Sequence, residues 1–213
     1  STSRRQRQMC IRDRWRSNVG VAVSDSPLGP FIDKGCLIDS KVIGVQNSID
    51  QFFYEDNGKK YMFWGSFRGI YATELTDNGL EIKKKTDGTP VLKKRICGNR
   101  FEGTNIYKRG EYYYLFASIG TCCNGATSTY QTVVGRSKNV LGPYLDKTGR
   151  DMLYDYCEII MSGNETWAGP GHNSILIQDD VGTDWIIYHG YKKKEAENGR
   201  YVLMDKLIWS NDG

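Results

Sequence analysis

The chain has 213 residues, of which 39% are hydrophobic and 25% charged, with 24 glycines against 5 prolines, a composition that is typical of a globular protein and excludes collagen-like and disordered chains. No apolar run is long enough for a transmembrane helix, so a membrane span is not expected. The net charge of +4 originates in the first 16 residues, which hold six arginines and one aspartate; the remainder has no basic excess, and nucleic acid is not expected as a partner.

Residues 1–18 form an Arg-rich leader. The leader contains no apolar core of the length that a secretory signal peptide needs. Such a segment is typical of a disordered tail or of an artefact of cloning or sequence assembly, and an arm that binds acidic surfaces is the alternative. We therefore expect one folded domain over residues 19–213.

Two kinds of repeat follow along the chain. Residues 21–34 (VAVSDSPLGPFIDK) and 134–147 (VGRSKNVLGPYLDK) share a Leu-Gly-Pro turn, so one structural unit occurs twice. A second pattern occurs in residues 48–66 (SIDQFFYEDNGKKYMFWGS), 101–120 (FEGTNIYKRGEYYYLFASIG) and 172–191 (HNSILIQDDVGTDWIIYHGY). Each copy places β-branched and aromatic runs on both sides of a turn with Gly, Asp or Asn, which predicts a β-hairpin.

Further short strands are predicted for residues 69–75, 131–137 and 201–209, and no window keeps a helical apolar stripe over three turns. The fold class is therefore all-β. Self-similarity at intervals of about 50 to 70 residues favours the blades of a β-propeller over a sandwich. Since blades bury their faces against their neighbours, the predicted units make an incomplete propeller of about three to four blades. We expect these to be antiparallel and centred on residues 46–92, 100–150 and 170–213.

The six cysteines show neither a C-x-x-C pair nor a His at zinc-ligand spacing, so a structural zinc site is not expected. Cys122 and Cys123 are adjacent, and we expect that they can hardly bond to each other without strain. The scattered remainder does not fix the redox compartment.

Three ionisable residues occupy the same place in the three predicted hairpins: Asp50, Glu102 and His172 each lie where the first strand begins. In a propeller the innermost strands begin at one mouth of the central channel, so these side chains are predicted to converge there. Two converging carboxylates raise each other's proton affinity, as a general acid requires near neutral pH. The alternative is that they are solvated residues at strand entries.

The hairpin segments, together with LGPYLDK, GPGHNS and GRYVLMDKLIW, resemble glycoside hydrolase family 43 and its arabinanase-like members. The resemblance covers residues 19–213. It implies a five-bladed β-propeller that hydrolyses arabinose- or xylose-containing plant polysaccharides with inversion, here the α-L-arabinofuranosidic linkages of arabinan, in the manner of an endo-1,5-arabinanase. An exo-acting α-L-arabinofuranosidase or β-xylosidase is one alternative, and a catalytically inactive carbohydrate-binding propeller is another.

The resemblance also implies roles for single residues. Glu102 matches the general acid, and Asp50 matches the aspartate that tunes the acid and orients the substrate. His172 matches a channel histidine beside a bound calcium ion, which makes it the candidate metal residue and Ca²⁺ the possible cofactor, with no organic cofactor. Arg200 matches an arginine that contacts the sugar in the cleavage subsite. Further substrate contacts are predicted for the end of the first hairpin, at Trp64, Ser66 and Phe67.

One element of the family pattern has no match. The family's general base is an aspartate in an Asp-Pro motif of the first blade, and nothing before residue 19 resembles that motif. The chain is therefore expected to be a fragment that carries the acid and lacks the base. We further expect a monomer that binds plant cell-wall polysaccharide or arabino-oligosaccharide and works outside the cytoplasm, in secreted or periplasmic form.

Overall fold

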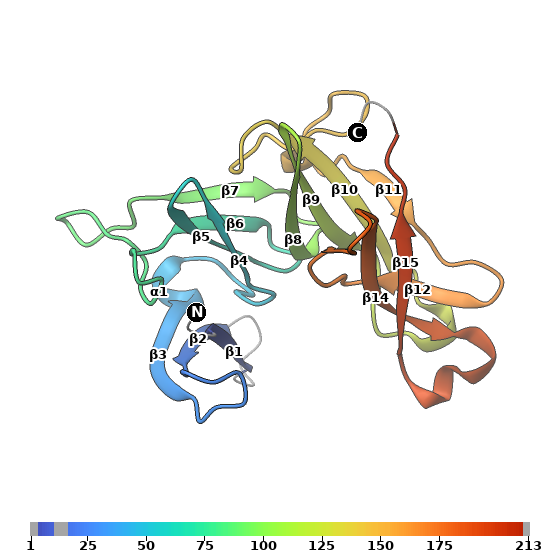
Figure 1. Ribbon diagram of the computed structural model, residues 1–213, viewed down its shortest axis with the longest axis horizontal. Coiled ribbons are helices and arrows are strands. Elements are labelled where there is room, and N and C mark those ends of the chain that lie inside the picture. The colour runs from blue at the N-terminus through green and yellow to red at the C-terminus, as the bar shows by residue number, and fades with distance from the viewer. Residues whose placement is uncertain (1–3, 11–16, 211–213) are drawn as a thin grey trace.

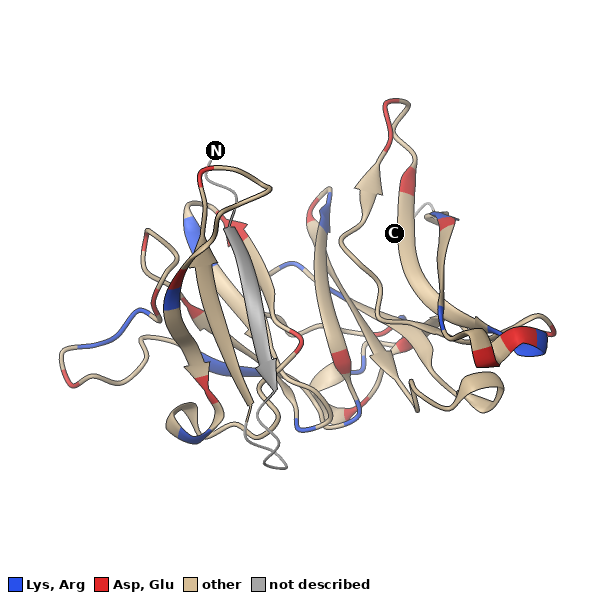
Figure 2. Cartoon of the chain, turned by 90° about the horizontal axis from the view of Figure 1, so that it is seen from below, with Lys and Arg blue, Asp and Glu red and all other residues tan. Residues whose placement is uncertain are grey.

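The computed structural model describes residues 4–10 and 17–210. Four antiparallel sheets follow one another along the chain (Figure 1). The expected all-β class is confirmed, because helical segments are confined to short turns between the strands. Lys and Arg positions and Asp and Glu positions are both spread over the described chain (Figure 2).

The first sheet has the order β1-β2-β3. Its strands are β1 (Arg4–Cys10), β2 (Ser17–Val23) and β3 (Ile32–Asp39). β1 pairs along its whole length with β2. Residues 4–10 of the expected disordered leader therefore belong to a sheet, and the folded part begins before residue 19; residues 1–3 and 11–16 of that leader lie outside the described residues.

The second sheet contains β4 (Phe52–Asp56), β5 (Lys59–Trp64), β6 (Ile70–Glu74) and β7 (Lys93–Cys97). The predicted first hairpin is β4 and β5, joined at Asn57 and Gly58, both with positive φ. Two adjacent left-handed residues match the right-handed twist of the strands, and Asn and Gly are the residues that adopt this conformation most readily. β7 extends the sheet beyond the predicted limit of residue 92.

The third sheet contains β8 (Glu102–Arg109), β9 (Tyr112–Ile119), β10 (Gln131–Ser137) and β11 (Glu158–Met161). β8 and β9 form the predicted second hairpin, and β10 coincides with the strand expected at residues 131–137. Glu102 lies opposite Ser118, so the start of β8 and the end of β9 share one end of the sheet.

The fourth sheet contains β12 (Trp167–Gly171), β13 (Ile177–Gln178), β14 (Asp184–Lys192) and β15 (Tyr201–Leu207). Both β12 and β13 pair with β14, so the first strand expected for the third hairpin is interrupted. Residues 172–176 leave the ladder between β12 and β13, and His172 has φ +50° there.

The helical segments are α1 (Ser40–Ile43) and the 3₁₀ turns η1 (Gly125–Thr127), η2 (Met152–Tyr154) and η3 (Lys193–Asn198). The Asp39 side chain caps α1 by accepting hydrogen bonds from the backbone of Lys41 and Val42. No helix in the described ranges has the length and apolarity needed to cross a bilayer.

The hydrophobic core lies between successive sheets. One cluster joins the first and second sheets through Val19, Ile38 and Met62. The largest cluster joins the second and third sheets and includes Phe63 and Leu115. A third cluster joins the third and fourth sheets. Because each sheet packs its face on the next one, the starts of β4, β8 and the end of β12 are fixed relative to one another.

Candidate active site

The structure brings together the three ionisable residues that the sequence singles out. Asp50 precedes β4, Glu102 begins β8 and His172 follows β12. The backbone N–H of Gly103 donates to the Asp50 carboxylate. A Cβ at Gly103, whose φ is +63°, would lie 3.1 Å from Cγ of His172, so only glycine allows the imidazole to approach this closely.

A cavity of about 490 Å³ opens among these strand ends. Asp50 is the only carboxylate among the described residues that line it. The remaining lining residues come from the second, third and fourth sheets and are mostly polar or aromatic: Gln51, Phe52, Phe53, Gly103, Thr104, Asn105, His172, Asn173, Ser174 and Ile175. Three sheets therefore contribute to one concave polar site.

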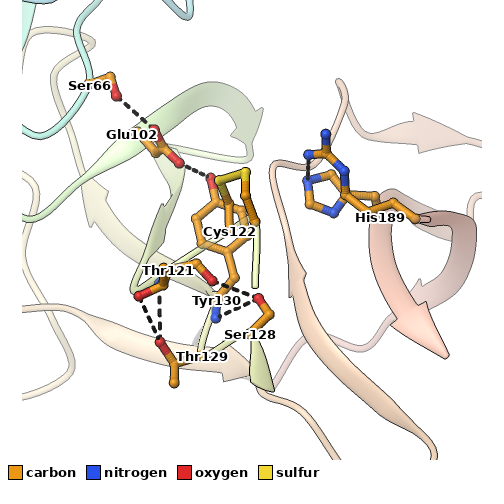
Figure 3. Close-up of a disulfide and its surroundings, with 10 residues drawn as sticks. Ser66, Glu102, Thr121, Cys122, Ser128, Thr129, Tyr130 and His189 are labelled. Carbon is orange, nitrogen blue, oxygen red and sulfur yellow. Dashed lines mark hydrogen bonds between the residues drawn. A yellow bond between two sulfur atoms is a disulfide. The ribbon is translucent and has the colours of Figure 1, made fainter. Parts of the chain in front are cut away.

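Glu102 is 7% exposed, and both of its carboxylate oxygens accept a hydrogen bond from a hydroxyl group. The Tyr130 hydroxyl donates to Oε1 at 2.6 Å and the Ser66 hydroxyl donates to Oε2 at 2.7 Å (Figure 3). The structure thus places Ser66, predicted as a substrate contact, beside the carboxyl group. Together the two hydroxyls fix the orientation of Glu102.

Burial raises the pKa of Asp50 from its ordinary 3.8 to about 6. The positive charge that His172 can carry opposes this rise, and the negative charge of Glu102 adds to it. A carboxyl group that holds its proton up to about pH 6, next to a second buried carboxyl group, is typical of a site for acid and base chemistry.

His172, His189 and Arg200 lie along one side of the site. The ring of His189 stacks on Tyr130 at 5.8 Å and on His172 at 6.4 Å between centroids. Nη1 of Arg200 lies 3.4 Å from Nε2 of His189. Burial, then the charge of Arg200, lower the pKa of His189 to about 4, so this imidazole is neutral at neutral pH. Arg200 therefore lies beside His189, and a contact between Arg200 and a sugar stays a prediction.

The prediction that Trp64 contacts the substrate is wrong. Its side chain is fully buried, packs in the core between the first and second sheets and donates to the Ser48 hydroxyl at 3.1 Å. A ring with no exposed surface cannot stack on a sugar. Phe67 is half-buried, and its backbone N–H bonds to the Phe101 carbonyl at the foot of β8, so a contact between Phe67 and substrate stays a prediction.

Tyr130 and His189 are two further residues of the candidate site whose contacts the sequence does not show. Tyr130 is fully buried and donates a hydrogen bond to Glu102. In the sequence it is one of many aromatic residues, and nothing before β10 distinguishes it. Gly171 makes room for its ring, because a Cβ there would lie 2.4 Å from Cδ1 of Tyr130. The sequence holds only two histidines, and this scarcity is the one sequence feature that indicates His189.

Several buried oxygens at the cavity have no hydrogen-bond partner. They are Asp50 Oδ2, Gln51 Oε1, Thr104 Oγ1, Asn105 Oδ1 and Asn173 Oδ1. Buried oxygens without donors suit a hard cation or ordered water. Within the described ranges no group of three or more His, Cys, Asp or Glu side chains is arranged to hold a metal ion, so a cation here would be held mainly by neutral oxygens.

Cys122 and Cys123, which were expected hardly to bond to each other without strain, form a disulfide. Figure 3 draws the disulfide with Glu102, Tyr130 and His189 among its surroundings. Cys36, Cys97 and Cys157 are free thiols.

Comparison with known proteins identifies close relatives. The family model described as "Glycosyl hydrolases family 43" matches residues 5–213. The chain is 35% identical over 214 residues to an extracellular exo-α-(1→5)-L-arabinofuranosidase of Cellvibrio japonicus, covering 92% of this chain and 61% of the relative. It is 34% identical over 199 residues to an extracellular endo-α-(1→5)-L-arabinanase of Bacillus subtilis, covering 92% of this chain and 59% of the relative. The chain thus spans about three fifths of the length of these curated relatives.

A solved structure shows the same arrangement of sheets. The α-L-arabinanase of Cellvibrio cellulosa in complex with arabinohexaose superposes with a TM-score of 0.82 at 31% identity, covering 99% of this chain and 71% of that chain.

Proposed function

The chain belongs to glycosyl hydrolase family 43, and from this we infer that it is part of an inverting enzyme that cleaves the α-L-arabinofuranosidic linkages of arabinan. The observation that carries the proposal is the buried Glu102 carboxyl, held by Ser66 and Tyr130 at the strand ends where Asp50 and His172 also lie. A relative that is 34% identical is described as an endo-α-(1→5)-L-arabinanase, which supports internal cleavage.

In this mechanism Glu102 is the general acid. It protonates the oxygen of the departing sugar, which lowers the free energy of the transition state as the glycosidic bond breaks. The hydroxyls of Ser66 and Tyr130 each donate to one carboxylate oxygen, so the ionised Glu102 left after proton transfer is stabilised where it stands.

Asp50 acts as an orienting and electrostatic residue. Its carboxylate lines the cavity and interacts electrostatically with Glu102 and His172. A negative charge at this position stabilises the positive charge that develops on the sugar ring. Arg200, beside His189, is available to donate hydrogen bonds to sugar hydroxyls.

Inversion also requires a general base, with the two carboxyl groups about 6.5 to 9.5 Å apart so that a water molecule fits between base and sugar. Among the described residues Asp50 is the only carboxylate that lines the cavity, and it is assigned to another role. We therefore propose that the base is an acidic residue outside the described residues.

The four sheets are proposed to be blades of a five-bladed propeller whose central channel holds the site. The support is the order of the sheets, each packed on the next, and the similarity to arabinanase structures. A calcium ion beside His172 is proposed on the unpartnered oxygens of Gln51, Asn105 and Asn173. Such an ion would supply positive charge beside Asp50 and favour its ionised form.

An exo-acting α-L-arabinofuranosidase is the second candidate. It is favoured by the 35% identity to a protein described with that activity. The polysaccharide of plant cell walls and its oligosaccharides are the proposed binding partners, and action outside the cytoplasm is proposed because both curated relatives are described as extracellular. A monomeric state stays a prediction that light scattering would test.

The test uses the intact protein and linear arabinan. An endo-acting enzyme releases oligosaccharides of several lengths from the first minutes, whereas an exo-acting enzyme releases one short product. Proton NMR of the newly formed anomer reports inversion. Binding of arabinan without any release of reducing ends, under conditions where a known arabinanase is active, would favour the carbohydrate-binding alternative and contradict the proposal.

A further inference from the structure

The loop that carries the disulfide leaves the third sheet at the same end as the proposed acid. Glu102 lies opposite Ser118, and β9 ends one residue later at Ile119. Residues 120–130 then lead back to β10, which begins opposite Ile119. The Cys122–Cys123 pair therefore projects beyond the strand end at which Glu102 begins β8 (Figure 3).

The base of this loop is held in place by side chains. The Ser128 hydroxyl donates to the Thr121 carbonyl at 2.6 Å, and the backbone N–H of Thr121 bonds to the Thr129 hydroxyl at 3.1 Å. Ser128 also packs on Gly169 of β12, where a Cβ would lie 2.0 Å from its oxygen. The base of the loop that carries the disulfide is thus held against both the third and the fourth sheet.

A sugar ring presents hydroxyl groups and apolar C–H faces, so its site needs polar groups and an apolar surface. Around Glu102 the polar groups are abundant, but two of the nearby aromatic rings are not free. Trp64 and Tyr130 are fully buried, and Tyr130 is engaged with Glu102. The disulfide offers the surface that these rings do not, because Cys122 is half-buried and Cys123 is exposed.

A disulfide suits this position chemically. Its sulfur atoms are polarizable and pack well against apolar groups. It carries no free thiol, so the pair itself adds no titrating or nucleophilic group to the site. Because the two residues are neighbours, the S–S bond closes a small ring through their peptide bond, and the resulting plate has few conformations to lose when a ligand binds.

We propose that the Cys122–Cys123 disulfide is a substrate-binding platform on which a pentose ring of the polysaccharide packs, in the subsite adjoining Glu102. This inference rests on the proposed function and adds the apolar wall of its binding site. The platform contacts the substrate equally before and during bond cleavage, so it contributes to binding and leaves the chemical step unchanged.

The first test measures protection of the disulfide in the intact protein that carries Glu102→Gln, which binds substrate without cleaving it. Dithiothreitol reduces the bond, and trapping with iodoacetamide followed by mass spectrometry gives the rate. Saturating arabinotriose is expected to slow reduction at least threefold, because a bound ring covers the sulfur atoms, whereas maltotriose should leave the rate unchanged. An equal rate with and without arabinotriose would overturn the platform.

The second test compares Cys122→Ser/Cys123→Ser with the matched control Cys36→Ser, which removes an exposed free thiol on β3. The double variant is expected to raise KM for arabino-oligosaccharides about tenfold with kcat within about twofold, and the control should change neither. A folded double variant with unchanged KM overturns the platform. If the protein hydrolyses arabinan but arabinotriose does not slow reduction of the disulfide, only the platform is overturned. If the unmutated protein hydrolyses no arabinan, the proposed function is overturned and the platform with it.

Discussion

Glu102 is surrounded by groups that suit both of its protonation states. Ser66 and Tyr130 donate to its two oxygens when it is ionised. A hydroxyl accepts as well as donates, so rotation of either hydroxyl allows a protonated Glu102 to keep the contact. A residue that must lose its proton to a leaving group and regain it in each turnover needs partners of this kind, and a fixed cation in their place would hold the carboxylate ionised.

The first prediction concerns Glu102→Gln in the intact protein. The variant cannot supply a proton, so hydrolysis of arabinan should fall by about a hundredfold to ten-thousandfold. Aryl arabinosides with good leaving groups need little protonation and should lose far less. Initial rates on both substrates test this, and an equal loss on the two would contradict the role of Glu102 as acid.

The second prediction concerns Tyr130→Phe. It removes the 2.6 Å hydrogen bond to Glu102 Oε1 while keeping the buried ring. As Tyr130 positions the acid, kcat should fall about tenfold and the pH profile of kcat should shift, with KM almost unchanged. The matched control is Tyr144→Phe, a fully buried tyrosine that donates to the Val140 carbonyl in the core between the second and third sheets. The control should lower Tm by a similar amount and leave the pH profile in place; a profile that moves equally in both variants would assign Tyr130 a merely structural role.

The third prediction follows from the pKa of Asp50. Burial raises it from 3.8 to about 6, so the folded state binds more protons than the unfolded state between these pH values. The free energy of unfolding must therefore fall as the pH rises through this window. Asp50→Asn removes the titration, so relative to the unmutated protein it should gain stability from about pH 4 upward, reaching about 3 kcal/mol above pH 6. Denaturant unfolding in EDTA at several pH values measures this, and parallel curves for the two proteins would contradict it.

At the scale of elements, local sequence predicted the strands whose turns carry a clear signal. The β4–β5 hairpin turns at Asn57 and Gly58, and both residues have the positive φ that such a turn requires. β7 and β11 have no such signal. β7 begins with exposed charged residues, and β11 is a short strand that a long connecting segment separates from β10. Outer strands are defined by pairing with a neighbour rather than by their own alternation.

The site was predictable to the extent that it depends on position within a repeat. Asp50, Glu102 and His172 occupy matching hairpin starts and do converge. Tyr130 lies at a loop end that leads into β10 and reaches Glu102 within the third sheet. His189 lies on a central strand of the fourth sheet, and the packing of this sheet on the third brings its ring beside Tyr130. Trp64 was mistaken for a surface residue because the sequence does not show that this end of β5 is covered by the first sheet.

The fourth prediction concerns Asp184 on β14, which ties two sheets together. Its buried carboxylate accepts from the Tyr107 hydroxyl of β8 at 2.6 Å and from Nε1 of Trp209 at 2.7 Å. Asp184→Ala leaves these donors unpaired and should lower the free energy of unfolding by about 2 to 4 kcal/mol, whereas Tyr107→Phe removes one donor and should cost about 1 kcal/mol. Urea unfolding gives both values, and equal losses would mean that the carboxylate contributes through Tyr107 alone.

At the scale of the whole molecule, stability comes from faces shared between sheets. The three core clusters each join one sheet to the next along the chain. This arrangement makes each sheet depend on its neighbours. It also explains how residues from three sheets hold one site, since a shift of any sheet would move Asp50, Glu102 or His172 relative to the others.

The last prediction follows from this dependence and from the proposed five-bladed ring. A protein restricted to residues 1–213 spans about three fifths of the length of the curated relatives, so in the proposed ring the first and fourth sheets would each have a face that no neighbour covers. Apolar side chains of the fourth sheet and the residues after it are exposed accordingly, with Val202 at 80%, Met204 at 55% and Ile208 at 90%.

We expect this restricted protein to bind a hydrophobic dye and to self-associate. It should also release no detectable sugar from arabinan, because four sheets do not close the proposed five-bladed ring around the site. Dye fluorescence, light scattering and a reducing-end assay, each run beside the intact protein, measure these properties. Turnover at the rate of the intact protein would show that closure of the proposed ring is not required.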